Sequence, residues 1–247
     1  MTAPVAVVTG GGKGIGRTVT ERLAGQGYRV IAVGRDGDAL ARVAAAEGVT
    51  SAVCDVTDED QVAAMFADLD AVDVLVNNAG VSSSAPIEST SLADWRLQLD
   101  VNATGAFLCT RAALPLMRPR AAGRIVTVAS TAGVTGAAYI TAYTASKHAA
   151  VGLMRAVAAE VAGTSITANA VCPGYVRTEM TDRSVARIAE KTGRSRDQAT
   201  EAIVSSSPLG RLIEPGEVAA AVDYLCSAEA AAVNGQVIVI DGGALRS

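Results

Sequence analysis

Seven short apolar segments alternate with longer stretches of helical periodicity, and this alternation limits the possible folds more than any other feature of the sequence. Short apolar segments rich in β-branched side chains are typical of buried strands. The predicted strands are Val5–Val8, Val30–Val33, Ser51–Cys54, Val74–Val76, Arg124–Ala129, Thr167–Val171 and Val237–Ile240. The helices predicted between the first six strands are Ile15–Ala24, Asp38–Ala46, Glu59–Ala67, Leu92–Met117 and Ala142–Val161.

Strand–helix–strand units of this kind connect parallel strands with one handedness, which predicts an α/β fold with a doubly wound, Rossmann-like parallel sheet. Asp58 is the predicted N-cap of the third helix, and Gly48 and Gly163 are predicted stop signals. The ligand crevice of such a sheet lies at the carboxyl ends of its strands. Polar or glycine-rich residues follow five of the predicted strands: Thr9–Gly16, Arg35, Asp55, Asn77–Gly80 and Ser130.

The composition predicts a single domain over residues 1–247, because half of the residues are apolar, only 3% are aromatic and no linker divides the chain. The net charge of −4 argues against nucleic-acid binding, which needs a basic surface. No signal-peptide pattern precedes the first strand, and no uncharged apolar run approaches the ~20 residues of a membrane span. We therefore expect a cytoplasmic protein with no membrane partner.

The cysteines do not have the spacing of a metal site. Cys54, Cys109, Cys172 and Cys226 are scattered without a Cys-x-x-Cys pair, so buried thiols are predicted. His148 is the one histidine of the sequence, and no zinc site is expected.

One segment, Tyr175–Gly210, interrupts the strand–helix rhythm with a polar, amphipathic sequence. Ser195 is a plausible N-cap for a helix that runs through Ile203. Long insertions of this kind are often lids over a binding site. A packed helical hairpin or a subunit contact is the alternative.

A glycine-rich turn follows the first strand and leads into a helix. Glycines allow a sharp turn and a close approach to a pyrophosphate, whose charge is favoured by the exposed N–H groups at the helix start. By itself the turn is also compatible with a tight strand–helix connection, but its place in the first strand–helix–strand unit favours dinucleotide binding. The residues predicted to contact the dinucleotide here are Gly10, Gly12, Lys13, Gly14, Ile15 and Gly16.

The end of the second strand bears on the choice of cofactor. An acidic residue there would bind a ribose 2′-OH, whereas an arginine accommodates a 2′-phosphate. The sequence has Gly34 in place of the acid, followed by Arg35, and Lys13 supplies a second cation. NADP(H) is therefore predicted over NAD(H), which stays possible because Asp36 is near and Arg35 could be a solvated surface charge.

Tyr143, Lys147 and Ser130 form a candidate catalytic set. On a helix, the four-residue spacing of Tyr143 and Lys147 places both side chains on one face. A fixed cation beside a phenol is expected to lower its pKa from about 10 toward the range useful for proton transfer. Ser130 would donate a hydrogen bond to a substrate carbonyl, although it could also cap a turn. His148 points about 100° around the same helix, which favours a packing or solvent-facing role.

These motifs resemble those of the short-chain dehydrogenase/reductase family over essentially the whole chain. The family's TGxxxGxG turn corresponds to Thr9, Gly10, Gly14 and Gly16, its NNAG motif to Asn77–Gly80, and its catalytic set to Asn102, Ser130, Tyr143 and Lys147. The resemblance implies that Asn102 positions a water behind Lys147, although an Asn in a helix can also bind backbone groups. It also implies that Lys147 holds the nicotinamide ribose.

The resemblance implies further cofactor contacts. Asp55 and Val56 resemble the adenine contact, and Asn78, Ala79 and Gly80 the turn beside the ribose. The residues that resemble the segment holding the nicotinamide carboxamide are Pro173, Gly174, Val176 and Thr178.

The resemblance also suggests a substrate and an assembly. The stretches Tyr143–Leu153 and Ser207–Ala219 resemble bacterial 3-oxoacyl-thioester reductases and polyketide ketoreductases, so a 3-oxoacyl substrate on an acyl carrier protein (ACP) or CoA is expected. Alternatives are a secondary alcohol or 3-hydroxyacid dehydrogenase and a non-catalytic nucleotide sensor. A homotetramer is expected to form through the helices at Leu92–Met117 and Ala142–Val161, although helix–sheet packing explains their small side chains equally well.

Overall fold

A computed structural model describes residues 3–120, 122–205 and 207–245, and within these ranges seven parallel strands form one sheet in the order β3-β2-β1-β4-β5-β6-β7. Each predicted strand overlaps an observed one, so the predicted doubly wound sheet is confirmed. The strands are β1 (Val5–Thr9), β2 (Arg29–Gly34), β3 (Val49–Val53), β4 (Val74–Asn77), β5 (Ala122–Val128), β6 (Ser165–Pro173) and β7 (Val237–Ile240).

Both faces of the sheet are buried, because successive side chains of each strand point to opposite sides. In β1, Val5 and Val7 belong to one apolar cluster, whereas Ala6 and Val8 belong to a second cluster on the other face. Aliphatic side chains on both faces explain why these strands read as continuous apolar segments.

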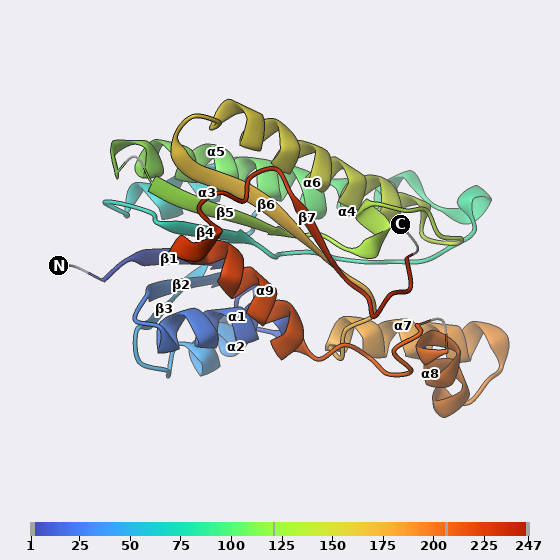
Figure 1. The fold of residues 1–247 in the computed structure, drawn as a ribbon. Coiled ribbons are helices and arrows are strands. Elements are labelled where there is room, and N and C mark those ends of the chain that lie inside the picture. Colours follow the sequence, from blue (N-terminus) through green and yellow to red (C-terminus); the bar gives the residue numbers. More distant parts are fainter. Residues whose placement is uncertain (1–2, 121, 206, 246–247) are drawn as a thin grey trace.

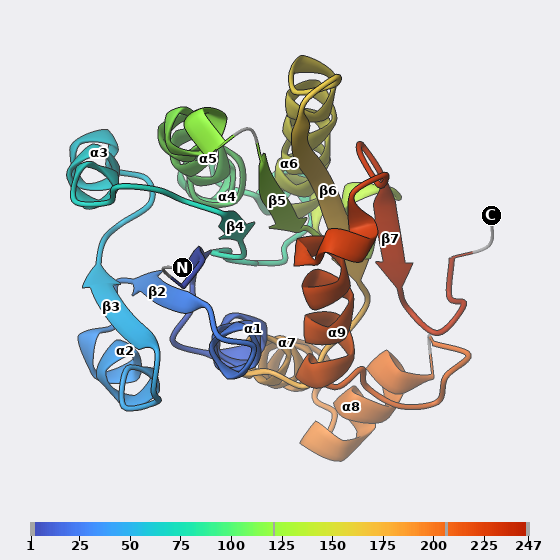
Figure 2. The ribbon, with the colours of Figure 1, turned by 60° about the vertical axis from the view of Figure 1, so that its left-hand side comes forward.

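Helices cover the two faces in separate layers (Figures 1 and 2). The helices on one face are α1 (Gly14–Gly25), α2 (Gly37–Val43) and α9 (Pro215–Cys226), and those on the other are α3 (Glu59–Ala67), α5 (Gly105–Met117) and α6 (Thr141–Glu160). α4 (Leu92–Leu99) packs against α6. α7 (Glu179–Thr192) and α8 (Arg196–Val204) lie beyond the carboxyl ends of the strands (Figure 1).

The helix predicted over Leu92–Met117 is interrupted, which corrects the sequence-based expectation. α4 ends at Leu99, residues Asp100–Thr104 form a π-helical turn, and α5 begins at Gly105. Such turns often occur at functional sites. Here the turn carries Asn102, a candidate site residue, whose amide contacts are described below.

The predicted helix boundaries hold elsewhere to within a few residues. Asp58 caps α3 by accepting hydrogen bonds from the backbone N–H groups of Asp60 and Gln61. Gly48 and Gly163 have φ angles of +77° and +84°, values that glycine tolerates better than other residues.

The sequence analysis missed α7 and α9, whereas it found α8 with Ser195 as its N-cap. For α9 a signal was present. Pro215 stands in the first helical turn, and Glu214 and Glu217 form a capping box at that end.

Candidate functional site

The glycine turn between β1 and α1 leaves no room for side chains. Gly10 and Gly14 have φ angles of +65° and +51°. A Cβ added to Gly10 would lie 2.8 Å from Nδ2 of Asn78, and one added to Gly16 would overlap the carbonyl of Gly10. Gly12 is similarly close to the backbone of Ala39, at 3.2 Å. The turn therefore requires glycine for steric reasons that its sequence alone only suggested.

The Asn77–Gly80 segment is hydrogen-bonded to this turn. Oγ1 of Thr9 accepts from the backbone N–H groups of Asn78 and Ala79, both at 3.0 Å. In return, Nδ2 of Asn78 donates to the carbonyl oxygens of Thr9 at 2.9 Å and Gly10 at 3.3 Å. The turns after β1 and β4 are thus joined at the point where the strand order reverses, which is where ligands bind in sheets of this type.

The start of α1 is suited to an anion. Its N-cap residue, Lys13, has extended backbone and no side-chain capping bond, and the first turn, which contains Ile15, carries no acidic residue. Free N–H groups and the helix dipole favour a phosphate at such a position. The residues present therefore fit the pyrophosphate of a dinucleotide.

The segment after β6 crosses this turn. A Cβ added to Gly14 would lie 3.2 Å from Cγ2 of Thr178, so the Thr178 side chain packs against the backbone of Gly14. Pro173 ends β6, and the N–H of Gly174 donates to the carbonyl of Ile240. Buried Val176 pairs with Ile213 in an isolated β-bridge. The structure thus brings the predicted nicotinamide segment to the glycine turn.

The two cations expected at a 2′-phosphate are engaged in ion pairs. Nζ of Lys13 lies 2.6 Å from a carboxylate oxygen of Asp36 and 3.8 Å from one of Glu179. Arg35 lies 3.4 Å from the carboxylate of Asp55. Of the five charged residues in these contacts, Arg35 and Asp36 follow β2, Asp55 follows β3, Glu179 begins α7 and Lys13 precedes α1. Asp36 also caps α2. Asp36 therefore does more than the sequence suggested, because it neutralises one of the predicted phosphate ligands.

Val56, expected near the adenine with Asp55, is almost fully buried against α5. A Cβ added to Gly105 would lie 2.7 Å from its Cγ2. Its side chain therefore supports the turn after β3 from the core side.

Ser130 follows β5 and faces Tyr143 on α6. Oγ of Ser130 accepts a hydrogen bond from the N–H of Ala132 at 3.1 Å, so it also caps the short turn that follows. The Ser130 hydroxyl is also close enough to the Tyr143 side chain to oppose a rise in the pKa of that phenol. The predicted pairing of these residues is thus present in the structure.

Lys147 is almost fully buried, and its Nζ donates to the carbonyl of Val128 at 3.0 Å. The ammonium lies 5.8 Å from the centroid of the Tyr143 ring. Burial lowers the pKa of Lys147 to about 8. A cation at this distance with a lowered pKa exerts less influence on the phenol than the sequence analysis assumed.

The expected lowering of the Tyr143 pKa is therefore wrong for this structure. Burial raises the pKa of Tyr143 to about 12, and the nearby Ser130 hydroxyl only partly opposes that effect. Desolvation disfavours the charged form of both groups, which raises the pKa of a phenol and lowers that of an ammonium. The phenol accordingly keeps its proton at neutral pH.

Asn102 joins three parts of the site. Its Oδ1 accepts from the N–H of Val81 at 2.8 Å, and its Nδ2 donates to the carbonyl of Val81 at 2.9 Å and to Oγ of Ser146 at 2.8 Å. Ser146 in turn donates to the carbonyl of Tyr143 at 2.8 Å. A Cβ added to Gly80 would lie 3.2 Å from Oδ1 of Asn102 and 3.4 Å from Nζ of Lys147, so both side chains face Gly80.

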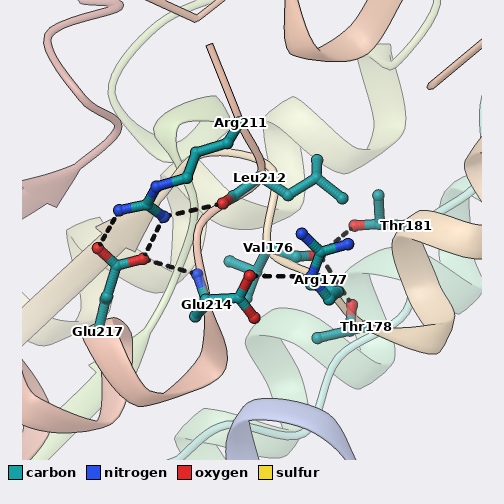
Figure 3. Close-up of polar contacts among 8 residues, drawn as sticks. All are labelled: Val176, Arg177, Thr178, Thr181, Arg211, Leu212, Glu214 and Glu217. Atoms are coloured by element: carbon teal, nitrogen blue, oxygen red, sulfur yellow. Dashed lines mark hydrogen bonds and ion pairs between the residues drawn. The ribbon is translucent and has the colours of Figure 1, made fainter. Parts of the chain in front are cut away.

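The base of the Tyr175–Gly210 segment is held by ion pairs that the sequence analysis did not identify (Figure 3). Arg177 pairs with Glu214 at 2.9 Å, and Arg211 makes two bonds to Glu217, at 2.7 and 2.8 Å. Arg177 and Glu214 are 37 residues apart in sequence, whereas Arg211 and Glu217 are 6 residues apart. Only the second spacing could have suggested an ion pair from the sequence. These contacts tie the segment to the start of α9.

The remaining candidates behave as isolated side chains. All four cysteines are buried, as predicted, and His148 is exposed, with Nδ1 3.0 Å from the carbonyl of Thr144. Among the residues that the structure describes, no three His, Cys, Asp or Glu side chains are grouped as a metal would require. In the same residues, no helix has the length and hydropathy needed to span a membrane.

Known sequences match this chain along nearly its whole length. The family model described as enoyl-(acyl carrier protein) reductase matches residues 10–244. The putative ketoacyl reductase 1 of the granaticin polyketide synthase of Streptomyces violaceoruber is 40% identical, and the match covers 97% of this chain and 92% of the relative. The D-beta-hydroxybutyrate dehydrogenase of Cupriavidus necator is 37% identical, with 98% of each chain covered.

Solved structures match the fold equally well. A crystal structure of a variant of actinorhodin polyketide ketoreductase with NADPH superposes with a TM-score of 0.94 at 36% sequence identity. The match covers 98% of this chain and 97% of that one.

Proposed function

This chain belongs to the short-chain dehydrogenase/reductase family of oxidoreductases, and on that basis we propose that it uses NADPH to reduce the ketone of a 3-oxoacyl thioester. The observation that carries the proposal is the grouping of Ser130, Tyr143 and Lys147 at the carboxyl ends of the strands. A ketoacyl reductase among the relatives supports the substrate class, and the NADPH-containing neighbour supports the cofactor.

The residues proposed to hold the cofactor line one path across the sheet. The glycine turn and the start of α1 would hold the pyrophosphate, and Lys13 and Arg35 the 2′-phosphate. Thr178 and the backbone from Pro173 to Val176 would hold the nicotinamide amide. When bound there, NADPH supplies the hydride.

The protein itself has to orient the ketone and deliver one proton. Ser130 donates a hydrogen bond to the ketone oxygen, and Tyr143 transfers its phenolic proton to that oxygen as negative charge develops. A donor placed at a developing oxyanion is typically worth about 3–4 kcal/mol. Because its pKa is raised, Tyr143 holds this proton at neutral pH, which suits the reductive direction. The Lys147 ammonium then stabilises the phenolate that remains. Asn102 positions a water behind Lys147, and this water connects Lys147 to the solvent.

The surroundings of the site are part of the same proposal. The Tyr175–Gly210 segment covers the substrate. The exposed apolar side chains Leu97 and Phe107, on α4 and α5, are covered in a homotetramer. Light scattering on the purified protein tests the assembly, since a monomer at micromolar concentration would contradict it.

The proposed activity is tested by following NADPH oxidation with acetoacetyl-CoA, 3-oxoacyl-ACP and a panel of simple ketones. We expect thioesters to give the highest kcat/KM, with NADPH preferred over NADH. A relative named D-beta-hydroxybutyrate dehydrogenase favours a second candidate, the oxidation of a 3-hydroxyacid or another secondary alcohol. If thioesters are not reduced but free 3-hydroxyacids are oxidised, the second candidate replaces the first.

A further inference from the structure

A pocket of about 110 Å³ opens beside the candidate catalytic residues, and we name it the α8 pocket. It is lined by residues that include Thr131, Tyr175, Ile203, Leu212, Ala244 and Leu245. Thr131 directly follows Ser130, and Tyr175 is close enough to Tyr143 to raise its pKa. If Ser130 and Tyr143 bind the oxygen of a ketone, one of the two substituents on its carbonyl carbon would thus lie at this pocket.

The surface that lines the α8 pocket is mostly apolar. Ile203, Leu212 and Leu245 contribute aliphatic side chains. The two charged residues of its wall are already paired. Arg211 binds both carboxylate oxygens of Glu217 and the carbonyl of Leu212, and the Asp241 carboxylate accepts the N–H groups of Gly243 and Leu245. An alkyl group would therefore be received without leaving a charge unpaired.

The walls of the pocket are held in place from three sides. The segment Arg211–Ile213 is anchored by the bonds of Arg211 to Glu217 (Figure 3) and by the pairing of Ile213 with Val176. Ile203 and Leu212 pack in a small apolar cluster with Val185 and Ala199. Oγ of Ser207 donates to the carbonyl of Asp241, which joins the end of the covering segment to the C-terminal residues. The pocket therefore has a defined size before substrate binds.

We propose that the α8 pocket receives the alkyl substituent on the ketone carbon and so limits the chain length of the 3-oxoacyl substrate. The inference rests on the proposed function. An apolar cavity of about 150 Å³ accommodates benzene, with its six carbons, so 110 Å³ accommodates roughly four carbons. The thioester arm is then the other substituent on the ketone carbon and lies outside this pocket. The substrates are then short 3-oxoacyl groups, from acetoacetyl to about 3-oxoheptanoyl.

The test is a chain-length series of 3-oxoacyl-CoA substrates with four to twelve carbons, assayed by NADPH oxidation. For the wild-type protein, kcat/KM is expected to fall by at least about tenfold once the alkyl group exceeds the pocket, since a misfitting methylene costs about 10–200-fold. Activity that stays constant up to twelve carbons would overturn the inference while leaving the proposed function intact. Absence of reduction at every length would overturn the proposed function.

Two variants change the pocket in opposite directions. Leu212→Ala enlarges it, and the limit is expected to move to longer chains, with the twelve-carbon to four-carbon ratio of kcat/KM rising at least tenfold. Ala244→Leu fills it from an exposed position, so folding is preserved, and the limit is expected to move below the wild-type length.

Matched controls separate pocket size from general effects. Leu209→Ala removes a partly exposed leucine of the same segment that does not line the pocket, and Ala220→Leu adds a leucine at an exposed position of α9. Both are expected to keep the wild-type profile. If Ala244→Leu leaves the profile unchanged, or if the controls shift it equally, the α8 pocket does not set chain length. NADPH affinity, measured by fluorescence, is expected to be unchanged in all four variants.

Discussion

Thr178 lies against Gly14, and a single methyl group on Gly14 would come within 3.2 Å of its Cγ2. Two segments 164 residues apart in sequence are thereby held in contact across the candidate cofactor cleft. The glycine turn is thus shaped by the segment after β6 as well as by its own backbone. This contact brings together the two segments that we propose to hold the pyrophosphate and the nicotinamide amide.

Replacing Gly14 with Ala is expected to weaken NADPH binding at least tenfold. The φ of +51° disfavours an L side chain, and the new Cβ would press on Thr178. Isothermal titration with NADPH measures the effect. Gly25→Ala is the control, because its Cβ would meet no atom within 4 Å, and binding there is expected to be unchanged. Equal affinity of Gly14→Ala and wild type would show that the contact is not tight in solution.

Replacing Tyr143 with Phe is expected to lower kcat by at least about a thousandfold, since the proposed proton donor to the ketone oxygen is lost. NADPH binding is expected to persist, so fluorescence titration and turnover should respond differently. Tyr224→Phe, at an exposed position on α9, serves as the matched control. Retention of more than a few per cent of activity in Tyr143→Phe would exclude this residue as the acid.

The Lys147 ammonium is expected to make stability depend on pH in a definite direction. Burial lowers its pKa from 10.5 to about 8 in the folded chain. Between these values the unfolded chain binds a proton that the folded chain does not, so the free energy of unfolding rises with pH across this window. Over the full window between these two pKa values, the free energy of unfolding is expected to rise by about 3 kcal/mol.

Lys147→Met removes this dependence. The variant is expected to be more stable relative to wild type at pH 7 than at pH 10, as measured by urea unfolding at both values. Cysteine and tyrosine ionisation affects both proteins alike and cancels in the difference. A stability difference that is the same at both pH values would mean that Lys147 is not desolvated in the folded protein.

Cofactor selectivity is expected to respond in opposite directions to two neighbouring substitutions. Arg35→Ala removes a cation, which should lower the NADPH to NADH ratio of kcat/KM at least tenfold. Asp36→Asn frees Lys13 from its ion pair while an Asn still caps α2, so the ratio should rise.

Arg42→Ala and Asp38→Asn, both at exposed positions on α2, control for net charge. If these controls change the NADPH to NADH ratio of kcat/KM as much as Arg35→Ala and Asp36→Asn do, selectivity depends on the net charge of this region and not on a local phosphate site. An unchanged ratio in Arg35→Ala would remove the argument for a 2′-phosphate contact there.

Much of the scaffold could be predicted because its signals are local. The valine-rich strands and the glycines before α1 carry their structural requirements in adjacent residues, and the spacing of Tyr143 and Lys147 follows from helix geometry. Asp58 and Ser195 were identified as N-caps because a cap bonds to backbone groups within three residues.

The rest depended on contacts between distant segments. The break at Asp100–Thr104 comes with the bonds of Asn102 to Val81 and Ser146, which helical periodicity does not encode. The pairing of Arg177 with Glu214 likewise joins two elements that only the folded chain brings together.

The sequence by itself determined which groups could exchange a proton, since a phenol, a hydroxyl and an ammonium follow the strand ends in a recognisable order. Tertiary structure decided their pKa values, because desolvation depends on all the atoms that enclose a group and not on its neighbours along the chain. That is why the Tyr143 pKa is raised, although the presence of Lys147 four residues away predicted that it would be lowered. The size of the α8 pocket was decided in the same way, by walls from the segment after β6, from α8 and from the C-terminal segment.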